Sequence, residues 1–85
     1  MGTATLTLTA HDVTETQELV LDGVQRDLPA GALAETLARR MALPDDVPWA
    51  LRDNVTSRVL DEKLPIGDQL SPAGSLTVFP RTHLG

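Results

Sequence analysis

Residues 30–44 read AGALAETLARRMALP, and this stretch decides the fold. Apolar Leu33, Leu37 and Met41 recur at every fourth position with alanines beside them, which gives a helix one narrow apolar face. The charged residues of the stretch fall on the opposite face. Pro44 cannot continue a helix because it has no backbone N–H to donate. The stretch therefore predicts one amphipathic helix that packs its apolar stripe on a core.

On both sides of this helix, apolar and polar residues alternate with a period of two, which indicates strands. The alternating segments are 3–10, 17–28, 49–52, 57–60 and 75–79. A one-turn connector over 65–68 precedes the last strand, and we expect Leu64, Ile66 and Leu70 to point inward there. This order predicts an α+β domain in which a mixed sheet packs on a single helix.

Asp22-Gly23 interrupts the second strand and can be read in two ways. It is either a bulge in one long strand that pairs with the first strand, or the tight turn of a hairpin. We favour the kinked strand.

Composition excludes several classes of function. The chain has 85 residues, a net charge of −5 and no cysteine, which predicts one domain without disulfides or Cys-ligated metals. An acidic chain is a poor ligand for nucleic acid, whose phosphates require clustered Lys and Arg. The sequence shows no leader and no long apolar run, so we expect a cytoplasmic protein without a membrane partner.

The residues suited to catalysis are few and scattered. His11 and His83 have no evident orienting partner, and the acidic pairs Asp45-Asp46 and Asp61-Glu62 lie in predicted turns, where solvated carboxylates are common. There is no glycine-rich nucleotide loop. We therefore expect no enzymatic activity, no metal site and no cofactor.

Several motifs occur at the spacing that is typical of one protein family. An apolar residue and proline close the helix at Leu43-Pro44, Leu60-Asp61 follows the short strand, and Leu76 and Val78 alternate in the last strand. In these features the chain resembles the ubiquitin family over nearly its whole length. The resemblance implies a β-grasp domain over residues 1–80 and a flexible tail over residues 81–85.

The chain is most similar to bacterial ubiquitin-like modifiers encoded beside activating and conjugating enzymes and a metal-dependent isopeptidase. The resemblance implies conjugation to target proteins through Gly85 after adenylation by an ATP-using activating enzyme, in some such systems linked to antiphage defence. Glycine suits this role because it has no Cβ to hinder attack on its carboxylate. Arg81, Thr82, His83 and Leu84 would then be read by the activating enzyme, whose channel must accept Leu84 where many modifiers have a second glycine.

Other residues are candidates for contact with partners. Arg52 and Phe79 are candidates for docking, and the family fold implies that Arg52 and Arg81 flank the tail. Lys63 is the only lysine, so it is the one candidate acceptor for chains built through lysine. We expect Trp49 to anchor the edge of the core.

Two alternatives remain open at this stage. One is a non-conjugated interaction module, similar to the ubiquitin-like components of type VII secretion systems, which needs no free terminal glycine. The other is a sulfur carrier with a thiocarboxylate at Gly85, which the preceding Leu84 disfavours.

Overall fold

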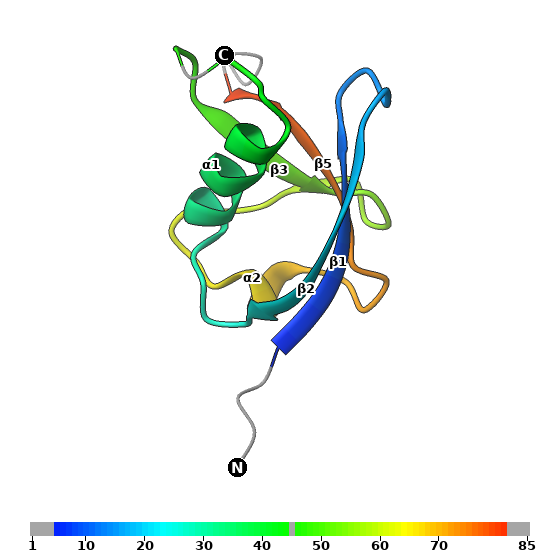
Figure 1. Cartoon of the computed structure of the whole chain (residues 1–85). Helices are drawn as coiled ribbons and strands as arrows, with labels where there is room; N and C mark the ends of the chain where they lie inside the picture. The colour runs from blue at the N-terminus through cyan, green and yellow to red at the C-terminus, as the bar shows by residue number, and fades with distance from the viewer. Residues whose placement is uncertain (1–4, 45, 82–85) are drawn as a thin grey trace.

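The computed structural model describes residues 5–44 and 46–81. Its elements follow the predicted order (Figure 1). They are β1 (Thr5–Asp12), β2 (Glu18–Gln25), α1 (Ala30–Arg40), β3 (Trp49–Asp53), β4 (Arg58–Val59), α2 (Ile66–Gln69) and β5 (Ser75–Pro80). The strands form one sheet in the order β2-β1-β5-β3-β4, in which β1 and β5 are parallel and the other pairs antiparallel. The predicted mixed α+β sheet on one main helix is confirmed.

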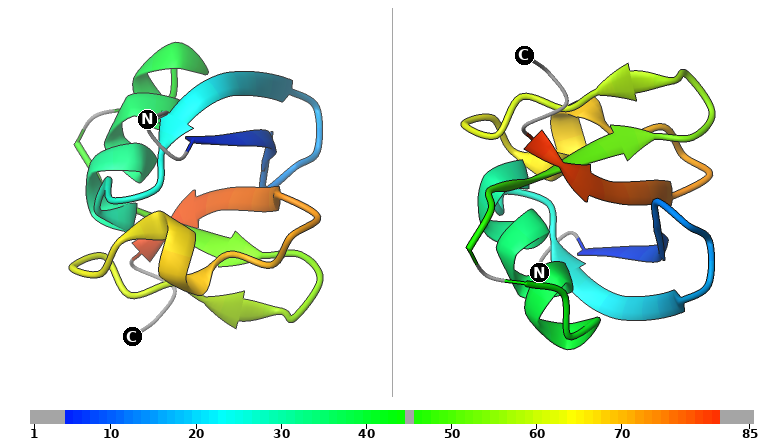
Figure 2. Two further views of the ribbon diagram at one scale, coloured as in Figure 1. Left: turned by 90° about the horizontal axis from the view of Figure 1, so that it is seen from below. Right: turned by 90° about the horizontal axis from the view of Figure 1, so that it is seen from above.

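α1 packs across one face of the sheet, and the described elements leave the other face uncovered (Figures 1 and 2). Leu33, Leu37 and Met41 of the predicted apolar stripe are all buried in the core. They meet Leu51 of β3 and Leu76 of β5, among other apolar side chains from the inner face of the sheet. Burial of one such leucine contributes about 1.5–3 kcal/mol. The helix predicted from residues 30–44 therefore forms, and its stripe closes the core.

The interruption at Asp22-Gly23 is a bulge within β2. β2 runs continuously from Glu18 to Gln25 and pairs with β1 on both sides of it, and the register shifts between Leu6 and Leu8 of β1. Gly23 has a φ of 70°, which glycine adopts without the strain a Cβ would cause. The kinked strand is confirmed, and the alternative of a hairpin turn is wrong.

The prediction for Leu64 is wrong, whereas those for Ile66 and Leu70 hold. Ile66 is fully buried and Leu70 packs against the core, but the Leu64 side chain is 48% exposed. The carbonyl of Leu64 accepts a hydrogen bond from the N–H of Ala30 at 3.0 Å. This bond fixes the backbone of Leu64 at the start of α1 while its side chain projects outward.

Two buried carboxylates hold the turns of the sheet. Asp53 is fully buried and accepts hydrogen bonds from the N–H of Ser71 at 2.7 Å, the N–H of Val55 at 2.9 Å and the Ser71 hydroxyl at 3.1 Å. Burial raises the pKa of Asp53, but these hydrogen bonds outweigh it and hold the pKa below the usual value. Asp53 thereby joins the end of β3 to the segment that leads into β5.

Asp12 does the same for the β1–β2 loop. Its carboxylate accepts hydrogen bonds from the N–H groups of Thr16 at 2.8 Å and Gln17 at 3.1 Å, and from the hydroxyls of Thr14 and Thr16 at 2.9 Å. Burial again opposes the charged form, but the hydrogen bonds prevail and lower the pKa of Asp12 to about 2. The hydrogen bonds therefore favour the charged form of both Asp12 and Asp53.

Candidate functional site

The end of β5 is the point from which the predicted tail departs. β5 lies between β1 and β3, and it pairs with β1 as far as Val78 and with β3 as far as Pro80. Its last residue, Pro80, is opposite Trp49 of β3, and the N–H of the next residue, Arg81, donates to the carbonyl of Pro48 at 2.8 Å. The base of the tail is therefore fixed to the sheet up to Arg81.

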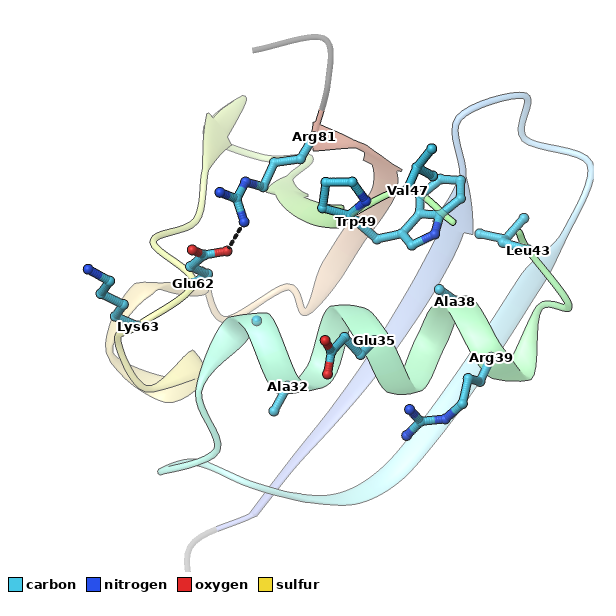
Figure 3. Close-up of a pocket in the computed structure, with 12 residues that line it drawn as sticks. Ala32, Glu35, Ala38, Arg39, Leu43, Val47, Trp49, Glu62, Lys63 and Arg81 are labelled. Carbon is cyan, nitrogen blue, oxygen red and sulfur yellow. Dashed lines mark hydrogen bonds and ion pairs between the residues drawn. The ribbon is translucent and has the colours of Figure 1, made fainter. Parts of the chain in front are cut away.

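The Arg81 side chain turns toward the helix side of the molecule and forms an ion pair with Glu62 (Figure 3). Both side chains are more than two-fifths exposed, so the pair adds little to stability. Glu62 is held in place by its backbone, because the N–H of Gly31 at the start of α1 donates to the Glu62 carbonyl at 2.9 Å. A Cβ on Gly31 would lie 3.0 Å from the Cβ of Glu62, so glycine permits this close approach.

A groove of about 600 Å³ lies between α1 and the start of β3, and Arg81 lines it. At one end the groove is apolar, with Leu43, Val47 and Trp49 together, and at the other it carries the Arg81–Glu62 pair (Figure 3). The Trp49 indole packs against the core and donates its Nε1–H to the carbonyl of Pro44 at 2.7 Å. Its predicted role as an anchor at the core edge is confirmed.

The two docking candidates lie on the face of the sheet that α1 does not cover. Phe79 is opposite Ala50, and Arg52 is opposite Thr77, so all four side chains share this outer face. Arg81 instead points into the groove beside α1. The structure therefore brings Arg52 and Phe79 onto one surface but does not bring Arg52 and Arg81 together.

Lys63, the candidate chain acceptor, is exposed at the rim of the same groove (Figure 3). Its backbone N–H donates to Oδ1 of Asp61 at 2.9 Å, which fixes the turn that presents it. The remaining predicted site residues, Thr82, His83, Leu84 and Gly85, lie outside the described residues, as does Asp45.

Sequence reasoning missed the role of Glu62 as the ion-pair partner of Arg81. No local signal reveals this contact, because it joins residues 19 positions apart through the fold.

Within the described ranges, no three His, Asp or Glu side chains gather closely enough to hold a metal ion. His11 pairs instead with Glu18 across the β1–β2 ladder, at 3.4 Å from Nε2 to Oε1. Neither described helix is both long and apolar enough to cross a membrane.

Comparison with known proteins gives a match in structure but not in sequence. No protein-family model matches the chain, and no curated protein does. Among solved structures, Caldiarchaeum subterraneum ubiquitin superposes with a TM-score of 0.71 at 15% identity, covering 92% of this chain and 95% of that one. The chain has the ubiquitin-like β-grasp fold.

Two further neighbours support this assignment of the fold. The C-terminal ubiquitin-like domain of mouse tubulin-specific chaperone e matches with a TM-score of 0.64 at 15% identity, covering 94% of this chain and 90% of that domain. A chain of a toluene 4-monooxygenase HD complex with the inhibitor 4-bromobenzoate matches with a TM-score of 0.72 at 15% identity, covering 91% and 99%. At this level of identity the likeness shows the fold alone, and it extends over nearly the whole of each chain.

Proposed function

We propose that this ubiquitin-like module is a protein modifier, joined to amines of target proteins through the carboxylate of Gly85. The observation that supports this proposal best is the anchoring of β5. Because β5 pairs with β3 up to Pro80 and the Arg81 N–H is hydrogen-bonded to the Pro48 carbonyl, the residues that follow begin at a fixed point of the domain. A partner enzyme that docks on the domain can therefore find the start of the tail at a defined position.

The reactive groups of such a pathway belong to its enzymes. The Gly85 carboxylate would attack the α-phosphate of ATP on an activating enzyme and release pyrophosphate. An enzyme thiolate would then displace AMP, and an amine of the target would displace the thiolate to form the amide bond. A conjugating enzyme and a metal-dependent isopeptidase would complete the pathway, and the domain would supply docking surfaces without chemistry of its own.

Incubation with an activating enzyme from the same host, ATP and Mg²⁺ tests the proposal. We expect a thioester that reducing agent cleaves, detected by intact-mass spectrometry. Deletion of Gly85 should abolish it, because Leu84 would then place a branched side chain beside the reacting carbon. A short extension added at the N-terminus should leave the reaction intact, whereas the same extension at the C-terminus should block it. Thioester formation by the protein that lacks Gly85 would refute the proposal.

One comparison favours a second candidate, a module that binds partners without conjugation. The chain that matches with 99% coverage comes from a toluene 4-monooxygenase complex, so this fold also occurs as a component of an enzyme assembly. A module of this kind would keep its partner when the C-terminus is extended. Co-purification of a partner at unchanged yield with the extended protein, without conjugates, would favour this candidate over the modifier.

A further inference from the structure

The groove between α1 and the start of β3 has an apolar end that the described residues leave open. Leu43, Val47 and Trp49 meet there, and each of these side chains is only half-buried (Figure 3). Burial of apolar surface is favourable, so a further apolar side chain seated against these three would be stabilised. With a volume of about 600 Å³, the groove has room for a leucine and the backbone that carries it.

The chain itself carries a leucine within reach of this apolar end. Pro80 is opposite Trp49 in the β3–β5 ladder, and directly opposite Cα atoms in such a ladder lie about 4.5–5.5 Å apart. The next residue, Arg81, lines the groove. Leu84 follows Arg81 by three residues, which span at most about 10–11 Å. The segment after Arg81 is therefore long enough to bring Leu84 to the apolar end, and it starts beside the groove.

A cation lies at the same end of the groove. Arg39, in the last turn of α1, is exposed and lines the groove near Leu43 (Figure 3). Among the described residues, no carboxylate lies within ion-pair distance of Arg39. The acidic side chains of the groove, Glu35 and Glu62, lie nearer its other end, where Glu62 pairs with Arg81. The apolar end thus offers one cation to an incoming carboxylate.

We propose that the tail of this chain docks in its own groove, with the Leu84 side chain in the apolar end. The Gly85 carboxylate then lies beside Leu84 and pairs with Arg39, a contact that rests on the proposed function, in which this carboxylate is free. Docking competes with activation, because a carboxylate held against Arg39 cannot enter the channel of an activating enzyme. A partner that occupies the groove releases the tail.

A spin label placed in the tail tests the docking. The chain has no cysteine, so His83→Cys supplies a single site for a nitroxide label. In the ¹⁵N-labelled full chain, the label should broaden the amide resonances of Leu43 and Arg39. Leu84→Ser, added to the labelled chain, keeps the length of the tail and should remove most of this broadening. Thr82→Ser is the matched control and should preserve it. Equal broadening with leucine and with serine at position 84 would overturn the proposal.

Two neighbouring arginines separate the contact with Arg39 from a general effect of charge. Arg39→Glu should reduce the broadening at Leu43, since it turns an attraction for the carboxylate into a repulsion. Arg40→Glu makes the same change one residue away, on the groove beside β2, and should leave the broadening unchanged. In the thioester assay, Arg39→Glu should react faster than Arg40→Glu. Equal behaviour of the two variants in both measurements would overturn the contact with Arg39.

A mixture of two samples distinguishes a second copy from the chain's own tail. When ¹⁵N-labelled protein without a spin label is mixed with unenriched spin-labelled protein, the resonances of the ¹⁵N-labelled copy should stay sharp. Broadening of its groove residues would assign the groove to the tail of a second copy and overturn the proposal. The fate of the proposed function is read separately. A thioester without broadening that depends on Leu84 would overturn the docking alone, and such broadening without a thioester would support the docking and count against the modifier.

Discussion

Replacement of Asp53 by asparagine tests how the turns around β5 are held. The carboxylate accepts the N–H groups of Ser71 and Val55 on different oxygens, Oδ2 and Oδ1. Asparagine has only one acceptor oxygen, so its amide NH₂ must face one of these donors and leave that N–H without a partner. A buried unsatisfied donor costs about 1–3 kcal/mol, and the hydrogen bonds that remain lose the strength that the charge gave them. We therefore expect Asp53→Asn to lower the free energy of unfolding by about 2–4 kcal/mol.

Urea titration followed by the fluorescence of Trp49, the only tryptophan, measures this change directly. Each 1 kcal/mol should also lower Tm by about 4–8 °C in a domain of this size. Asp27→Asn is the matched control, because it removes the same charge from an exposed position and should stay within about 0.5 kcal/mol of the parent. Equal stability of the two variants would refute the role assigned to Asp53.

The pH dependence of Asp53→Asn has a definite sign. The folded-state pKa of Asp53 lies below the reference value of 3.8, so the unfolded state takes up its proton first as pH falls. The stabilisation by Asp53 is therefore fully present above about 3.8 and is lost as pH falls through the lower folded-state pKa. The difference in stability between the parent and Asp53→Asn should shrink over this range, and a difference that widened there would contradict the argument.

Three further predictions concern the core, the turns and the β1–β2 loop. Leu37→Ala removes a fully buried side chain and should destabilise the fold by about 2–5 kcal/mol in the same urea assay, and a loss below about 1 kcal/mol would contradict its place in the core. Gly74→Ala should lower Tm clearly more than Gly23→Ala does. Both glycines have a positive φ, but only at Gly74 would a Cβ meet a backbone oxygen, at 2.7 Å. Equal decreases in Tm would show that the structure relieves this contact without cost. The β1–β2 loop, which Asp12 holds, should keep its protection from hydrogen exchange above pH 3.8 and lose it as pH falls through the folded-state pKa of Asp12, about 2. In Asp12→Asn the protection of this loop should be weaker and should not change with pH over this range.

The elements were predictable where local pattern and tertiary packing agree. The stripe of Leu33 and Leu37 gives a helix, and the alternation around Leu76 and Val78 gives a buried strand, because one face of each element meets the core. The bulge at Gly23 could also be predicted from the sequence, since glycine permits the positive φ that the kink requires.

What the sequence could not reveal depends on distant contacts. Leu64 fits an inward apolar pattern but is exposed, because its carbonyl is committed to the start of α1. Asp53 reads as an ordinary turn residue, and only the fold brings Ser71 to its carboxylate. Likewise, Arg81 pairs with Glu62 on the helix side of the sheet, whereas Arg52 lies on the outer face. No local spacing in the sequence indicates this separation of the two arginines.

Mass spectrometry of proteins from the native host tests the central claim most directly. Trypsin cuts after Arg81, so a target lysine joined to Gly85 would keep the remnant Thr-His-Leu-Gly on its side chain. We expect lysine-containing peptides with this remnant in cells that express the parent chain, and none in cells that express the form without Gly85. If the parent accumulated only as the free protein and no lysine carried the remnant, the chain would not be a modifier.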